Sequence, residues 1–77
     1  MEEQDIMNAY YSRTAIEVFR FSRWEKAIPK DVHVGVNGLE AVNLQLLKED
    51  GFPSAITFSI IADDFASKLR QRVVDAS

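Results

Sequence analysis

The stretch Ser54–Val74, SAITFSIIADDFASKLRQRVV, decides the predicted fold. In its first half Ile56, Phe58 and Ile60 alternate with small polar residues, which is the period of a strand with one face in a core. From Phe65 onward the apolar residues recur at spacings of three and four, the period of an amphipathic helix. A buried strand that leads directly into a helix predicts an α+β domain, because both elements need the rest of the chain to cover them.

Asp63 and Asp64 lie where the period changes. A carboxylate at the first turn of a helix accepts hydrogen bonds from free backbone N–H groups and is stabilised by the helix dipole. Two carboxylates could also bind a divalent cation, but adjacent side chains project in different directions and no third acidic residue lies at a matching local spacing. We therefore interpret the pair as a helix cap and predict no metal site and no cofactor.

Length and composition indicate a single small domain over residues 1–77. The chain has no cysteine, so no disulfide or thiolate metal site can stabilise it. Its hydrophobic fraction of 47% is ordinary for a globular protein, so a disordered chain is not expected. It has no apolar run long enough to span a bilayer, and it begins with acidic residues where a signal peptide would be basic. We therefore expect a cytoplasmic protein that does not contact a membrane. The acidic net charge of −3 argues mildly against a dedicated DNA-binding protein.

The N-terminal part of the chain has two interpretations. Acidic residues crowd the start of 2–12 and its apolar residues fall on one side, which predicts a helix. The segment 14–24 is rich in β-branched and aromatic residues, so we expect a strand there. The alternative is one long helix over 3–27, since the apolar residues of 14–24 fit neither period cleanly. In both interpretations this segment is apolar on two sides and must be covered on both.

The middle of the chain is also ambiguous. Alternating valines predict a strand over 32–36. Asn37-Gly38 is the strongest short hairpin signal, yet the residues after it end like a helix, with Gly51 as the left-handed C-terminal residue and Pro53 beyond it. Good helix formers are dense there and favour a helix over 38–50. The prediction is thus a small two-layer α+β domain with a mixed sheet of about three strands, 14–24, 32–36 and 54–61, and helices at about 2–12, 38–50 and 63–75.

Few residues in the chain are suited to catalysis. The single histidine, His33, lies among valines, where a solvent-facing or hydrogen-bonded residue is more common than a catalyst. The three glycines form no phosphate-binding pattern. We therefore predict that the protein is not an enzyme and has no catalytic residues.

The leading prediction for function is a small non-enzymatic protein–protein interaction module, such as an inhibitor, an adaptor or an accessory protein. A chain this small gains from covering an apolar surface by self-association, and the two-fold homodimer is the commonest assembly. Large aromatic residues dominate the energetics of interfaces. The predicted partner-binding residues are therefore Phe19, Phe21 and Trp24.

The alternative prediction is a nucleic-acid-binding regulator that uses the block 13–30. Basic residues in this block are interleaved with aromatic ones, and such a combination neutralises phosphates while the rings stack on bases. A domain of this size also needs those rings for its core, which makes nucleic acid the less favoured partner. The predicted nucleic-acid contacts are Arg13, Arg20, Arg23, Lys26 and Lys30.

Overall fold

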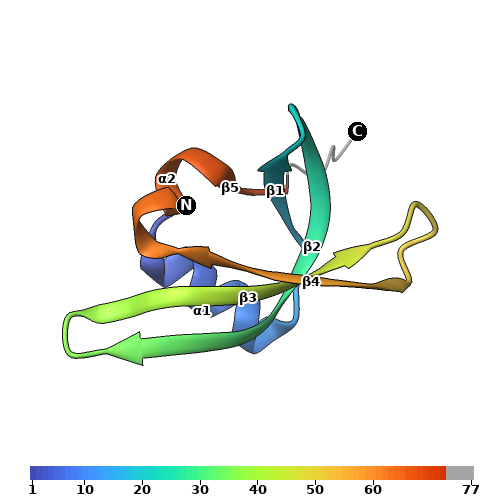
Figure 1. Cartoon of the computed structure of the whole chain (residues 1–77). Helices are drawn as coiled ribbons and strands as arrows, with labels where there is room; N and C mark the ends of the chain where they lie inside the picture. Colours follow the sequence, from blue (N-terminus) through green and yellow to red (C-terminus); the bar gives the residue numbers. More distant parts are fainter. Residues whose placement is uncertain (73–77) are drawn as a thin grey trace, which may run out of the picture.

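The computed structural model describes residues 1–72 and consists of a five-stranded antiparallel sheet with helices at its margins (Figure 1). The strand order is β4-β3-β2-β1-β5, so each strand lies beside the next one along the chain until β5 returns to pair with β1. The elements in chain order are α1 (Glu3–Ser12), β1 (Ile16–Arg20), β2 (Arg23–Gly35), β3 (Gly38–Leu47), β4 (Pro53–Ile61), the 3-10 turn η1 (Ala62–Asp64), α2 (Phe65–Lys68) and β5 (Leu69–Gln71).

The predicted fold class was wrong. The sheet is antiparallel with five strands, where a mixed sheet of about three was expected, and no long helix covers 3–27. The segment 14–24 contains β1, a two-residue turn and the start of β2, and the strand expected at 32–36 is the far end of that same β2. The range 38–50 holds strand β3 in place of a helix, with buried residues alternating along its second half.

The helix predicted at 63–75 was also wrong for the residues that the structure describes. The four-residue α2 ends at Lys68, and at Leu69 the backbone becomes extended with φ −124° and ψ 140°. Leu69 pairs with Val18 of β1 and is 1% exposed, so burial in the core overrides the local preference for helix. Asp64 precedes α2, but its side chain makes no capping hydrogen bond. Residues 73–75 of the predicted helix lie outside the described residues.

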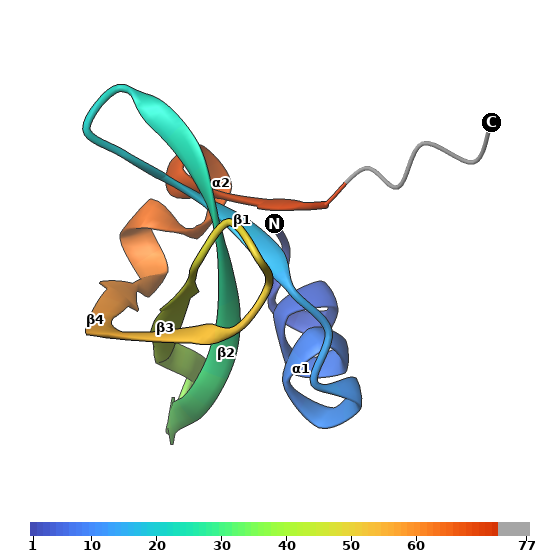
Figure 2. The same cartoon turned by 90° about the vertical axis from the view of Figure 1, so that its right-hand side faces the viewer.

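Strand β2 organises the sheet because it is long and bent. Its first part pairs with β1 and its second part with β3. The register slips between Pro29 and Asp31, which leaves Lys30 as an extra residue. A proline cannot donate a ladder hydrogen bond and is tolerated within a sheet at such a bulge, which also bends the strand. As a result, the β1–β2 hairpin projects away from the other strands, as Figures 1 and 2 show.

The hydrophobic core lies between α1, α2 and the sheet, and β4 contributes least to it. Phe58 and Ile60 of β4 are only partly buried, whereas every other strand has a fully buried side chain. Within residues 1–72 no polar or charged side chain is buried, so the core is apolar throughout. Its members are Ile6, Ala9, Ile16, Val18, Ala27, Leu39, Val42, Leu44, Leu46, Phe65 and Leu69.

A carboxylate fastens α1 to the turn between β2 and β3. Glu3 Oε1 accepts a hydrogen bond from the backbone N–H of Leu39 at 2.9 Å. Gly38, the residue before it, has φ +107°, a conformation that favours glycine. The hairpin indicated by Asn37-Gly38 is thus present, but its two turn residues are Val36 and Asn37, and Gly38 begins β3 opposite Gly35. The hydrogen bond from Leu39 holds α1 against this turn. No helix within the described part of the chain is long and apolar enough to cross a membrane.

Candidate functional site

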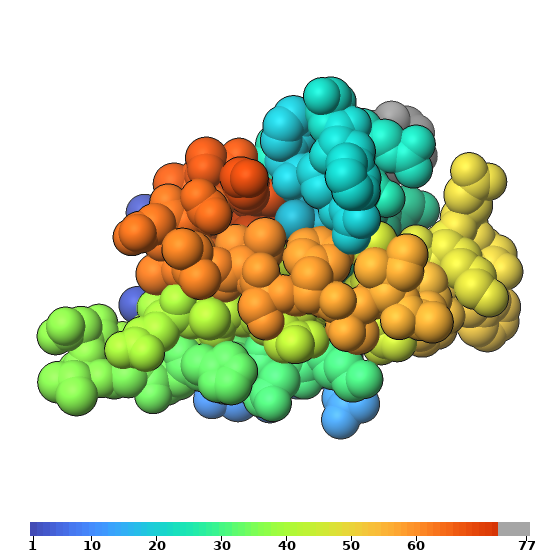
Figure 3. Space-filling view, viewed as in Figure 1, coloured from blue at the N-terminus to red at the C-terminus, as the bar shows by residue number. Residues whose placement is uncertain are grey.

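Strand β4 forms one edge of the sheet and carries no charged residue. Figure 3 shows it as a gold-to-orange band across the molecular surface, with the blue-green β1–β2 hairpin against one side of it, where the guanidinium of Arg20 lies 4.8 Å from the centre of the Phe58 ring. Ile56 and Ile61 are 51% and 54% exposed, and 57–61 pairs with β3 in a regular register. Native proteins usually protect an edge strand with lysines, prolines or bulges. The stretch 57–61 has none of these, which makes it suited to pairing with another strand.

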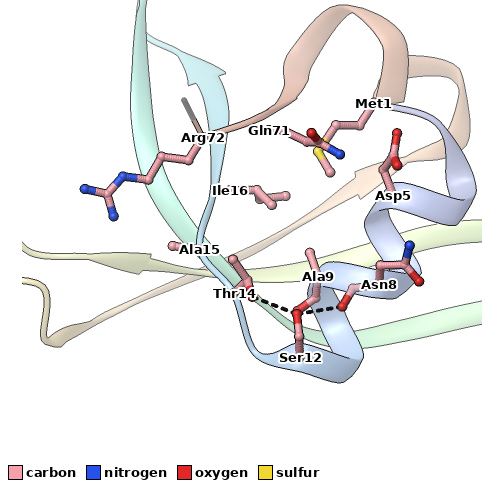
Figure 4. Close-up of a pocket in the computed structure, with 10 residues that line it drawn as sticks. All are labelled: Met1, Asp5, Asn8, Ala9, Ser12, Thr14, Ala15, Ile16, Gln71 and Arg72. Atoms are coloured by element: carbon pink, nitrogen blue, oxygen red, sulfur yellow. Dashed lines mark hydrogen bonds between the residues drawn. The ribbon is translucent and has the colours of Figure 1, made fainter. Parts of the chain in front are cut away.

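The opposite edge, β5, borders a pocket of about 310 Å³ (Figure 4). The pocket lies beside α1 and the start of β1, and the nearly buried Ile16 lines it. The Ser12 hydroxyl closes one side, with hydrogen bonds to Asn8 O at 2.8 Å and to Thr14 Oγ1 at 2.7 Å. The lining residues are Met1, Asp5, Asn8, Ala9, Ser12, Thr14, Ala15, Ile16, Gln71 and Arg72.

The tip of the β1–β2 hairpin brings the three predicted partner-binding residues together. Phe19 and Trp24 face each other with ring centroids 5.3 Å apart, and the guanidinium of Arg70 lies 4.1 Å above the Trp24 ring. Phe21 is 81% exposed and contacts the guanidinium of Arg20 at 4.6 Å. Trp24 and Phe19 thus stabilise the hairpin, and Phe21 is the aromatic ring that the hairpin presents to solvent.

The turn at this tip has an unusual backbone for its residues. Phe21 and Ser22 have φ values of 52° and 63° and connect the paired residues Arg20 and Arg23. Positive φ at both central residues is the signature of a type I′ turn, which strongly prefers Asn-Gly. A bulky residue in this conformation is strained by about 1–2 kcal/mol, and such strain concentrates at functional sites.

Replacing Phe21-Ser22 with Asn-Gly should therefore raise the free energy of unfolding by about 1–2 kcal/mol. Thermal unfolding measures this, since 1 kcal/mol shifts the melting temperature of such a domain by roughly 4–8 °C. Phe21→Ala is the matched control, because it removes the ring but keeps a side chain at positive φ. A double variant no more stable than this control would mean that the turn is not strained.

Three of the predicted nucleic-acid contacts lie beside carboxylates. Arg20 Nε is 3.1 Å and Arg23 Nη2 is 3.6 Å from oxygens of Glu25. Lys26 is paired in register with Glu17 on β1. The charges of Arg20 and Arg23 are thus offset by Glu25, and Lys26 has a carboxylate on the neighbouring strand, which weakens the attraction of this group for phosphate.

The remaining two predicted contacts, Arg13 and Lys30, line one groove of about 610 Å³. We call it the tyrosine groove, because Tyr10 and Tyr11 of α1 form one wall. No acidic residue lines it. Its members are Tyr10, Tyr11, Arg13, Ile28, Pro29, Lys30, Gln45 and Pro53.

Other residues considered for chemistry remain isolated. His33 is exposed on β2 opposite Ala41. Among residues 1–72, no three histidine, aspartate or glutamate side chains lie close enough to hold a metal ion. Neither the β4 edge nor the pocket beside β5 was among the predicted sites. The uncharged run 53–61 was a usable signal for the edge, but the pocket depends on the pairing of β5 with β1.

Comparison of the chain with known protein families, curated proteins and solved structures finds no match.

Proposed function

We propose that the protein is a non-enzymatic, self-associating interaction module in which the β4 edge of one copy docks at the pocket beside β5 of the next. The observation that carries this proposal is the uncharged edge formed by β4, which pairs with another strand on one side only. Unpaired backbone groups along such an edge favour the addition of another strand.

The two edges of the sheet differ, which favours a head-to-tail contact. β4 presents the exposed side chains of Ile56 and Ile61, and β5 lies beside the 310 Å³ pocket that Ile16 lines. An apolar surface that fits a pocket elsewhere on the same molecule forms a heterologous interface. Such a contact produces a closed ring when the rotation between neighbours completes a full turn, and a filament otherwise.

The two-fold dimer through Phe19, Phe21 and Trp24 is the competing proposal. β1 is hydrogen-bonded on both sides, to β2 and to β5, so its backbone has no free edge to offer. In this alternative Phe21 would supply most of the contact, because the other two rings pack against each other. A cytoplasmic location stays part of both proposals.

We expect light scattering at tens of micromolar protein to give a mass of three or more chains. The double variant Ile56→Lys/Ile61→Lys should reduce this mass to that of one chain, because lysines on an edge strand oppose pairing. Val36→Lys is the matched control, since Val36 is fully exposed at the β2–β3 turn and lies on neither edge. This control should keep the parent mass.

A mixing experiment tests the head-to-tail geometry. Ala15→Phe is designed to fill the pocket beside β5 while leaving β4 intact. The Ala15→Phe variant and the Ile56→Lys/Ile61→Lys variant should each be monomeric alone. An equimolar mixture of the two should form a one-to-one dimer. A monomeric parent protein would overturn self-association. A parent dimer that Phe21→Glu separates would support the two-fold contact through the hairpin instead.

A further inference from the structure

The tyrosine groove contains two cations that lie at irregularities of the backbone. Arg13 is the C-terminal cap of α1 and has φ 54°, a conformation in which glycine is the usual residue. Lys30 is the extra residue of the bulge in β2. Bulges are common beside functional sites, where they redirect a side chain. Two independent backbone irregularities thus deliver positive charge to the same groove.

These two cations differ from the basic residues of the β1–β2 hairpin. On that hairpin, Arg20 and Arg23 each lie within 3.6 Å of a carboxylate oxygen, and Lys26 is paired in register with Glu17. Within residues 1–72, neither Arg13 nor Lys30 forms a salt bridge, and the groove has no acidic lining. In a protein with a net charge of −3, this groove is a local site of uncompensated positive charge.

The wall of the groove supplies aromatic surface beside the charge. Tyr10 and Tyr11 have ring centroids 5.4 Å apart with planes tilted by 52°, and Tyr11 is 74% exposed. On the other side, Gln45 donates a hydrogen bond from Nε2 to Ser54 O at 2.9 Å, which fixes this residue against β4. The groove therefore has a fixed wall, a free ring face and two cations.

We propose that the tyrosine groove binds single-stranded nucleic acid, with a base stacked on Tyr11 and backbone phosphates neutralised by Arg13 and Lys30. Stacking needs an unstacked base, which a duplex does not offer, and cations beside aromatic rings are the usual means of binding single strands. An acidic peptide would satisfy the cations but leave the ring face of Tyr11 unused. This inference is independent of the edge pairing.

Fluorescence anisotropy with labelled twelve-nucleotide RNA and DNA of mixed sequence tests the proposal with the full chain. Binding should weaken from 50 to 200 mM salt, and Lys30→Gln should lower the salt slope by roughly 0.7. Tyr11→Ala should weaken binding by about 5- to 150-fold. Phe21→Ala and Arg23→Gln are the matched controls, an exposed ring and an exposed cation outside the groove. Both should bind like the parent.

Arg13→Gly separates binding from folding. Glycine suits positive φ, so this variant should melt at a higher temperature while binding the oligonucleotides more weakly. No retention of RNA or DNA at 50 mM salt would overturn the proposal, as would controls that weaken binding as much as the groove variants. If polyglutamate displaces the oligonucleotide and binds the Tyr11→Ala variant as tightly as the parent, that result would also overturn the proposal and favour an acidic peptide. The mass of each variant is measured in parallel by light scattering, so that a loss of nucleic-acid binding can be distinguished from a loss of self-association.

Discussion

Replacing Leu44 with alanine is expected to lower the free energy of unfolding by about 2–5 kcal/mol. Leu44 is 0% exposed and lies on β3, which is paired with Pro29 of β2 on one side and with Phe58 of β4 on the other. Because both neighbours are held by the sheet, the site cannot collapse to fill the cavity. A loss of this size is a large fraction of the stability of so small a domain.

Urea unfolding monitored by the fluorescence of Trp24, the single tryptophan, measures the Leu44→Ala effect. Val36→Ala is the control, because Val36 is fully exposed and should lose almost nothing. If the two variants unfold at the same urea concentration, the core does not lie where the structure has it.

The second large effect is expected at Gly38. A Cβ atom at this residue would lie 2.9 Å from both carboxylate oxygens of Glu3, and its backbone has φ +107°. Gly38→Ala should therefore add strain and push away the carboxylate that accepts the Leu39 N–H. We expect a total cost of about 2–4 kcal/mol, combining strain with a weakened charged hydrogen bond.

Gly51→Ala is the matched control for this variant. Gly51 also has positive φ, +89°, but a Cβ there would meet no atom within 4 Å. Its cost is strain alone, so the difference between the two variants in thermal unfolding reports the contact with Glu3. In a Glu3→Ala background the extra cost of Gly38→Ala should disappear. Equal costs of the two glycine substitutions in the parent would show that Glu3 does not hold the turn.

The strand β3 illustrates how the sequence misled the prediction of the middle of the chain. Asn37-Gly38 and the alternation of Val42, Leu44 and Leu46 indicated a hairpin, and the structure has one. A register slip at Glu40 leaves Leu39 and Val42 both buried at a spacing of three, which imitates a helical stripe. Strong helix formers in 38–50 then outweighed the period of two, although tertiary pairing determines the conformation here.

The two ends of the chain differ in whether neighbouring residues alone determine their secondary structure. The N-terminal helix observed at Glu3–Ser12 was predictable, because acidic residues at its start and apolar residues on one side are local features. The end of α2 was not, since Leu69 is extended by its pairing with β1, far away along the chain. The five basic residues predicted as one nucleic-acid site also depend on contacts between distant parts of the chain. The fold places Arg13 and Lys30 in the tyrosine groove and the other three beside Glu25 and Glu17.

The strand order also sets an expected sequence of events in folding. Three of the four strand pairs join strands that follow each other along the chain, so most of the sheet closes short loops. The β1–β5 pair instead joins Glu17 to Arg70 across 53 residues, through a strand of only three residues. Closing a long loop with few contacts is slow and weakly favoured, so β5 should dock last and exchange its amide hydrogens first. In the proposed assembly, the edge that receives a neighbour is then the last to form, and each added copy would complete the folding of the one before it.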